Sequence, residues 1–196
     1  KAYCIIMSMK SNAFIIPIIP ILLFSCSQPQ HSFGDYEIVD APDRICEAAY
    51  QFAKLYEGAE TEYAWGGQDP LRAIQMDCSG LVVMCYKYAL VDTKYSLLAS
   101  DMTAAYMHES AATPIEKKDL KRGNLIFMGE ENSGRTTHIA IFDRIENGAI
   151  YFIDSTQKDT NNDGIDDING VTTRCYPEND KRFKGFGRMK VQLLLD

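Results

Sequence analysis

The sequence predicts a single α+β domain in which helices come first and an antiparallel sheet follows. Apolar positions in residues 43–90 recur at helical spacing, whereas residues 124–195 contain short segments rich in β-branched and aromatic side chains, separated by turn residues. The chain has 196 residues, of which 46% are hydrophobic and 24% charged. This composition suits one globular domain with a substantial core.

The charge of the chain excludes one class of partner. The formal net charge is −7, and no cluster of Lys and Arg of the kind that tracks phosphates occurs along the sequence. Because binding to nucleic acid depends on neutralising phosphates, nucleic acid is not expected as a partner.

The first residues have the pattern of an export signal. A short basic segment (7–12) precedes twelve apolar residues (13–24), too few for a helix that spans a bilayer, which needs about 20. The segment Leu23-Phe24-Ser25-Cys26 resembles a bacterial lipobox, which implies a signal over residues 1–25 and a lipid on Cys26. The protein is then exported and anchored to a membrane of the cell envelope; a plain signal with a chance cysteine is the alternative. Residues 26–42 are rich in Ser, Gln, Pro and Asp and predict a tether before the domain at 43–196.

Three helices are expected in the first half of the domain. Helical spacing of apolar residues predicts a helix over 43–56 that stops at Gly58. A long apolar run predicts a buried helix over 78–90. A shorter helix is expected over 101–108, with an N-cap at Ser100 or Asp101.

The second half predicts about five strands. Residues 124–129, 137–145 and 149–155 form a meander, in which Glu146-Asn147-Gly148 is a tight hairpin turn. Further strand segments lie at 171–176 and 186–195.

Cys78 stands at the predicted start of the buried helix, where a sulfur can be reactive. Free backbone N–H groups and the helix dipole favour the thiolate at such a position. Asp77 opposes this effect, so a nearby imidazolium would be needed as well. A buried cysteine is also commonly a small apolar core residue, which is the competing interpretation.

One histidine is a candidate partner for this sulfur. His31 falls in the predicted tether and His108 is expected on the surface of a helix, which leaves His138 at the start of a strand. If the hairpin pairs about Asn147, residues whose numbers sum to roughly 294 lie opposite one another, and His138 comes close to Asp154. A carboxylate there can orient the imidazole as the third member of a Cys–His–Asp relay. The remaining cysteines of the domain, Cys46, Cys85 and Cys175, do not form a disulfide framework, and a Cys46–Cys175 bridge is left open.

Five motifs, in this order and spacing, resemble the NlpC/p60 family of cell-wall cysteine peptidases over residues 43–195: YAWGG (63–67), DCSGLV (77–82), LKRGNLIFM (120–128), THIAIF (137–142) and YFIDST (151–156). The resemblance implies a papain-like fold, in which the helix carrying the nucleophile packs on an antiparallel sheet. It also implies hydrolysis of peptide stems in peptidoglycan or muropeptides, usually between D-γ-glutamyl and a diamino acid. No cofactor is required for that chemistry.

The resemblance also assigns roles to residues. It implies that Cys78 is the nucleophile, His138 the base, and Asp154 the third polar residue, which is most often histidine in the family. Tyr63 matches a tyrosine whose hydroxyl helps to bind the oxyanion.

Three further residues are expected to bind substrate. Asp77 and Ser79 match positions that hold the free amine of the stem's L-Ala in family members. Trp65 is grouped with them, and its side chain is expected to pack beneath the Gly66-Gly67 turn.

A polar segment outside the family pattern predicts a calcium site. In DTNNDGIDD (159–167), oxygen ligands recur at alternate positions around a glycine turn, at Asp159, Asn161, Asp163 and Asp167. The twelfth position of an EF-hand loop would be Gly170 and not glutamate, which excludes a full EF-hand. A solvated polar turn is the alternative.

Two other functions stay open from the sequence. One is an amidase or acyltransferase on the same fold. The other is a non-catalytic lipoprotein that binds the cell wall.

Overall fold

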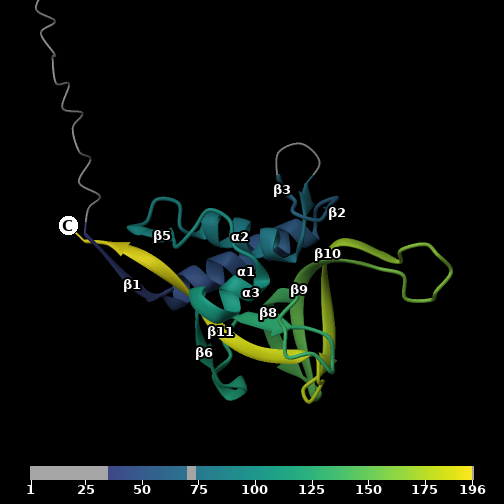
Figure 1. Ribbon diagram of the computed structural model, residues 1–196. Helices are drawn as coiled ribbons and strands as arrows, with labels where there is room; N and C mark the ends of the chain where they lie inside the picture. Colours follow the sequence, from purple (N-terminus) through teal and green to yellow (C-terminus); the bar gives the residue numbers. More distant parts are fainter. Residues whose placement is uncertain (1–34, 70–73, 196) are drawn as a thin grey trace, which may run out of the picture. The chain divides into compact units, whose positions relative to one another are not determined.

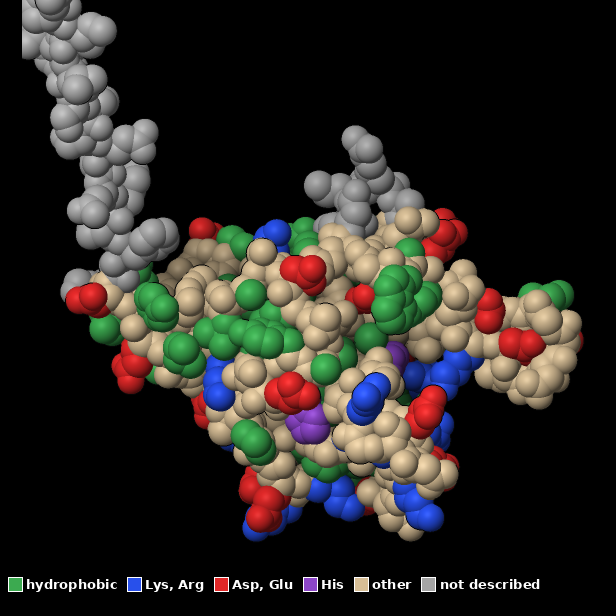
Figure 2. Space-filling view, in the orientation of Figure 1, with side chains coloured by type: hydrophobic (Ala, Val, Ile, Leu, Met, Phe, Trp, Pro, Cys, Tyr) green, Lys and Arg blue, Asp and Glu red, His purple; other side chains and the backbone are tan. Residues whose placement is uncertain are grey.

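The structure is a computed structural model that describes residues 35–69 and 74–195 (Figure 1). The predicted signal, Cys26 and His31 lie outside the described residues. None of the helices in the described part of the chain combines the length and apolar character needed to cross a membrane. On the face drawn in Figure 2, acidic and basic side chains are interspersed.

Two helices form one layer of the domain. Helix α1 (Asp43–Glu57) buries one stripe of side chains, and the N–H of Gly58 closes its C-terminus on the carbonyl of Lys54. Helix α2 (Cys78–Ala89) is buried over most of its length, as its apolar sequence predicts. The two helices lie side by side against the sheet in Figure 1.

The main sheet has eight strands in antiparallel pairs. Its central order is β1-β11-β7-β8-β9-β10, and β5 and β6 also pair with β11. The strands are β1 (Tyr36–Asp40), β5 (Tyr95–Leu97), β6 (Ala112–Ile115), β7 (Leu125–Met128), β8 (His138–Glu146), β9 (Ala149–Lys158), β10 (Ile168–Pro177) and β11 (Phe183–Leu194). The five strands expected from the sequence are β7 to β11, and the sheet is larger because β11 is long enough to pair with three additional short strands.

The expected tether is wrong in its last part. Residues 36–40 form strand β1, which pairs with β11 in the register Val39↔Val191. Most side chains of β1 are exposed, so the segment lacks the alternation of apolar and polar residues that identifies a strand in a sequence.

Alternate side chains of the strands build a separate core on each face of the sheet. Leu125, Phe127, Ile139 and Ile141 pack with the helices. Ile126, Ala140, Phe142 and Phe152 pack on the opposite face with aromatic side chains from β10 and β11. Because successive side chains of a strand point to opposite faces, the strands that carry the candidate site are packed against apolar side chains on both faces.

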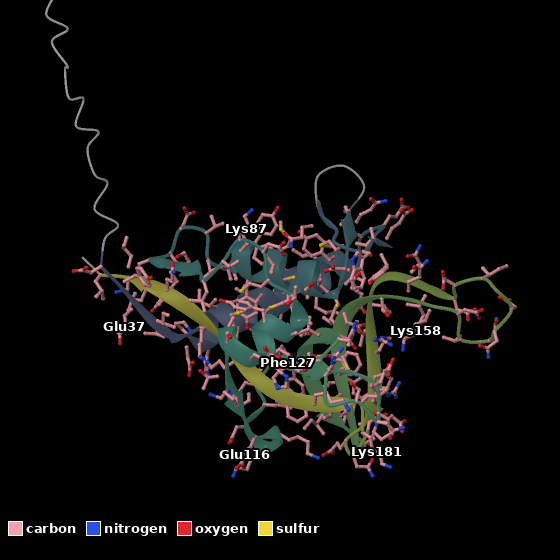
Figure 3. All side chains as sticks on the ribbon, viewed as in Figure 1. Glu37, Lys87, Glu116, Phe127, Lys158 and Lys181 are labelled. Carbon is pink, nitrogen blue, oxygen red and sulfur yellow. The ribbon has the colours of Figure 1, made fainter. Side chains whose placement is uncertain are left out.

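The helix expected over 101–108 is shorter and its cap differs. Helix α3 spans Ala104–Tyr106, and the Thr103 hydroxyl accepts from the N–H of Tyr106 at 3.1 Å, so Thr103 is the N-cap. A π-helix (Met107–Ala111) follows. His108 lies in this π-helix and is partly exposed, and its ring stacks on Phe127 with centroids 4.4 Å apart (Phe127 is labelled in Figure 3).

Candidate active site

Cys78 is the first residue of α2, and Asp77 is the helix N-cap. One carboxylate oxygen of Asp77 accepts from the N–H of Gly80 at 2.6 Å and from the Ser79 hydroxyl at 2.9 Å. The other accepts from the N–H of Gly66 at 3.0 Å. Asp77 therefore fixes both the helix start and the preceding turn around the sulfur.

The segment that carries Cys78 is also tied to the sheet. A small sheet of β2 (Glu62–Tyr63), β4 (Gln75–Met76) and β3 (Gln68–Asp69) leads into α2. The carbonyl of Met76, two residues before Cys78, accepts from the buried Ser155 hydroxyl at 2.6 Å. Because Ser155 is next to Asp154, this bond sets the spacing between the sulfur and the rest of the relay.

His138 and Asp154 meet as the hairpin register predicts. Strands β8 and β9 pair as Ile141↔Ile153, and a bulge shifts the register only beyond Phe142. His138 Nε2 lies 2.5 Å from an oxygen of Asp154, which is fully buried. Cys78 lines the same pocket as His138 and lies near enough to raise the pKa of the imidazole. Since Nε2 is engaged by Asp154, Nδ1 is the ring nitrogen left available to the sulfur.

The surroundings of His138 favour the imidazolium. Burial lowers the pKa of His138, but the hydrogen bonds and negative charges of Asp154 and Cys78 outweigh burial and raise the pKa to about 10. Burial would raise the pKa of Asp154, but its hydrogen bonds keep that pKa below the usual value. At neutral pH the relay therefore contains a charged imidazole beside a carboxylate.

A hollow of about 380 Å³ opens beside this relay. Tyr63, Cys78 and His138 line it together with Asp77 and Ser79. Burial, followed by the charges of Cys78 and Asp77, raises the pKa of Tyr63, so its hydroxyl stays protonated and can donate a hydrogen bond. The structure thus brings Tyr63, Asp77 and Ser79 to the sulfur, where the sequence predicts them.

Trp65 is part of the wall of this hollow, but its expected packing is wrong. The side chain is 89% exposed and does not pack beneath the Gly66-Gly67 turn. That turn is filled by backbone instead: a Cβ on Gly67 would lie 2.8 Å from the carbonyl oxygen of Ala64. The indole is therefore free to contact a molecule in the hollow.

The pattern of the NlpC/P60 family matches residues 60–174, more than half of the chain, and covers Tyr63, Cys78, His138 and Asp154. The chain belongs to the NlpC/P60 family. Its α+β architecture, with a cysteine at the start of a helix packed on an antiparallel sheet, is the papain-like fold of that family.

Relatives with known names cover part of the chain. "Murein DD-endopeptidase MepH" of Escherichia coli (strain K12) is 35% identical over 89 residues, which are 45% of this chain and 30% of that protein. "Probable endopeptidase YafL" of the same organism is 31% identical over 80 residues, 41% of this chain and 29% of that protein. The solved structure of NlpC1 from Trichomonas vaginalis is similar with a TM-score of 0.50 at 20% identity, and the match covers 83% of this chain and 48% of the NlpC1 chain. The chain thus spans less than a third of the length of MepH and of YafL.

Three other cysteines lie within the described residues, and none forms a disulfide. Cys46, Cys85 and Cys175 are free, so the Cys46–Cys175 bridge left open by the sequence is not formed. Burial raises the pKa of both Cys46 and Cys85, which therefore remain thiols.

The polar loop after β9 keeps its carboxylates occupied with its own backbone. It leaves the sheet beyond Lys158, labelled in Figure 3, and extends away from the domain in Figure 1. Asp159 accepts from the N–H groups of Asn162 at 2.6 Å and Gly164 at 2.8 Å. Within the described residues, no group of three or more His, Cys, Asp or Glu is arranged to hold a metal ion. Calcium in this loop, on Asp159, Asn161, Asp163 and Asp167, stays a prediction.

Sequence reasoning missed Arg174, on β10. Its Nε donates to one oxygen of Asp154 at 2.9 Å, and its Nη2 donates to the other. No motif marks this arginine, because β9 and β10 are joined by the polar loop and the sequence does not fix their register.

Proposed function

We propose that the protein is a cysteine endopeptidase that hydrolyses the peptide stems of peptidoglycan at the cell envelope. The observation that supports this most strongly is that Cys78, at the start of a helix, lines one hollow with His138, and that His138 is hydrogen-bonded to the buried Asp154. Family membership and the names of two relatives agree with this reaction class.

Acylation would begin with attack of the Cys78 sulfur on the scissile carbonyl carbon. The first N–H groups of a helix have no partner within the helix, so the N–H of Cys78 can bind the oxyanion. The Tyr63 hydroxyl lines the same hollow and can donate a second hydrogen bond. As the tetrahedral intermediate collapses, the C–N bond breaks and the proton on Nδ1 of His138 passes to the leaving amine.

Deacylation reverses the role of His138. The neutral imidazole takes a proton from water, and the resulting hydroxide attacks the thioester carbonyl. The C–S bond then breaks, which releases the acid and restores the Cys78 thiolate beside the His138 imidazolium. Asp154 holds Nε2 throughout, so Nδ1 faces the sulfur in both half-reactions.

Substrate orientation would come from Asp77 and Ser79. The Asp77 carboxylate already accepts three hydrogen bonds, and a carboxylate has about four acceptor positions, so one stays available to an amine. This fits the free amine at the start of a stem peptide. The exposed ring of Trp65 can pack against the same ligand.

The bond that we propose is the one between D-γ-glutamyl and the diamino acid. The name of the relative MepH, a murein DD-endopeptidase, makes a DD bond the second candidate. Purified protein should be incubated with muropeptides of known structure and the products identified by mass spectrometry. Product masses distinguish the two bonds, and Cys78→Ala should give no products while keeping the thermal stability of the wild type.

Rival functions predict different results in the same experiment. An amidase or acyltransferase would act on an acyl-peptide or lipid substrate and leave the stem intact. A wall-binding protein without catalysis would retain muropeptides unchanged, and its Cys78 would react with a thiol probe no faster than a free thiol.

Attachment to the membrane is a separate proposal. We expect a lipid on Cys26, which would hold the domain at the envelope near its substrate. Incorporation of a labelled fatty acid into the full chain, and its loss in Cys26→Ala, tests this directly.

A further inference from the structure

Arg174 has no role in the proposed chemistry so far, although it contacts the relay. Its guanidinium engages both oxygens of Asp154, and its Nη2 lies 3.5 Å from His138 Nε2. The Asp154 side chain has no solvent exposure, and that of Arg174 is only 10% exposed. The pair is thus shielded from water, so its charges act strongly on the imidazole.

The sheet holds this guanidinium in one place. In the β9–β10 register Thr172 lies opposite Asp154 and Arg174 lies opposite Phe152, so Arg174 and Asp154 are diagonal neighbours. The guanidinium lies 5.5 Å from the ring centroids of both Phe152 and Tyr176. Its Nη1 also donates to the Tyr176 hydroxyl at 2.8 Å. Arg174 is therefore a rigid donor pair aimed at the carboxylate.

We propose that Arg174 is a positioning residue of the catalytic relay, which keeps Asp154 ionised and directs one of its oxygens to His138 throughout the reaction. The inference rests on the proposed cysteine–histidine chemistry. It adds a fourth residue that acts through Asp154 and does not touch the substrate.

The reason lies in the reaction cycle. His138 is charged before attack but neutral after it has protonated the leaving amine. In that neutral state, Asp154 without Arg174 would be a buried anion with no cation beside it, and it would take up a proton. A protonated Asp154 would donate to Nε2 instead of accepting from it and so reverse the tautomer. Arginine does not lose its proton, so the carboxylate stays paired in both states.

The same pairing explains how an acidic residue can stand where the family most often has histidine. Asp154 and Arg174 together carry no net charge, and in this respect the pair is equivalent to a neutral histidine. His138 therefore receives an oriented acceptor without an uncompensated anion behind it.

A double-mutant cycle tests this role. Arg174→Met should lower kcat on a muropeptide at least 30-fold and change KM less than threefold, because Arg174 does not touch the substrate. Arg174→Lys should recover part of kcat, since it keeps the charge but loses the bidentate geometry. In an Asp154→Asn background, Arg174→Met should have little further effect. That double variant also guards against misfolding, because it leaves no buried unpaired charge.

The pH dependence separates a positioning role from a structural one. Within the described residues, the charged groups that face Asp154 are His138 from β8 and Arg174 from β10, and Cys78 of α2 faces His138. Loss of Arg174 raises the pKa of Asp154, so activity is lost at a higher pH on the acid side. The acid limb of kcat/KM should move up by at least one pH unit. A merely structural loss would lower activity without moving this limb, and that result would overturn the proposal.

A readout without substrate completes the test. The rate of Cys78 alkylation by iodoacetamide at pH 7, followed by mass spectrometry of the Cys78 peptide, should fall at least tenfold in Arg174→Met. The matched control is Arg182→Met, which removes an arginine that pairs with Asp180 and does not contact Asp154. Fast alkylation that Arg174→Met slows would support the proposal even if no muropeptide were cleaved. Equal alkylation rates and equal acid limbs in wild type and Arg174→Met would overturn it.

Discussion

Asp154→Asn is the perturbation whose consequences follow most directly from the geometry. The carboxylate is fully buried, lies 2.5 Å from His138 Nε2 and accepts two hydrogen bonds from Arg174. The amide that replaces it has the same shape but no charge, and its NH₂ group must face a donor, either Arg174 or His138. The substitution therefore removes a charge and places two donors against each other.

The cost to stability can be worked out from the pair that is broken. Removal of one partner of a buried ion pair costs about 3 kcal/mol or more, because the remaining charge stays buried without compensation. For a domain of this size, about 3 kcal/mol lowers Tm by roughly 6 to 12 °C. Asp180→Asn is the matched control, since it breaks the Asp180–Arg182 pair but leaves His138 alone, and should cost about 1 kcal/mol.

The effect on catalysis has a magnitude and a direction. An Asp→Asn change in a Ser–His–Asp triad lowers kcat about 10⁴-fold through the wrong tautomer, so a loss of about 10² to 10⁴ is expected here. Asp154 helps to raise the pKa of His138 to about 10, so its loss lowers that pKa. The imidazolium is then lost at lower pH, and the basic limb of activity should move down by about one unit or more, each worth about 1.4 kcal/mol. Muropeptide hydrolysis between pH 5 and 11 measures both kcat and the position of the basic limb. If neither changes in Asp154→Asn, Asp154 does not act on His138 as proposed.

Three other predictions follow from residues around the site. Gly80→Ala should lower both activity and Tm, because a Cβ at Gly80 would lie 2.1 Å from the carbonyl oxygen of Gly67 and would displace the Gly66-Gly67 turn from the start of α2. Wild-type activity and Tm in this variant would contradict the packing. Trp65→Ala should raise KM at least threefold and leave stability within about 0.5 kcal/mol, since the ring is exposed at the hollow, and an unchanged KM would remove its role in binding. Calorimetry with CaCl₂ should show binding of calcium to the wild type and no binding to Asp159→Ala. If the wild type shows no heat of binding, and a chelator leaves its activity unchanged, the calcium hypothesis is wrong.

Much of the relay was predictable because one turn fixes it. Asn147 and Gly148 adopt positive φ values of 52° and 74°, the geometry of a tight two-residue hairpin, so the pairing of β8 with β9 could be counted from the sequence. Next to the turn the paired residue numbers sum to 295, as in Glu146↔Ala149, and the bulge between Phe142 and Arg144 changes the sum to 294, as in Ile141↔Ile153. The count about Asn147 is therefore one residue off at the turn but holds on the strand segment that leads to His138. Local chemistry and strand geometry therefore sufficed for Cys78, His138 and Asp154.

The rest depended on contacts that no local pattern encodes. Arg174 reaches Asp154 only because β10 pairs with β9 across a long polar loop, whose length does not determine a register. Strand β1 is mostly exposed and is a strand only because β11 extends far enough to pair with it. Trp65 was expected beneath a glycine turn, but backbone atoms close that turn and the large ring has no room there.

The most direct measurement of the central claim compares two sulfurs of one molecule. Cys175 is an exposed free thiol outside the hollow, whereas Cys78 is only 9% exposed and lines the hollow with His138. Both can be alkylated with iodoacetamide at pH 7 and their rates read from separate peptides. Cys78 should react at least tenfold faster than Cys175 despite its lower exposure, and this advantage should vanish in His138→Ala. If Cys78 reacts more slowly than Cys175 in the wild type, the sulfur is an inert core residue and the proposed catalysis is wrong.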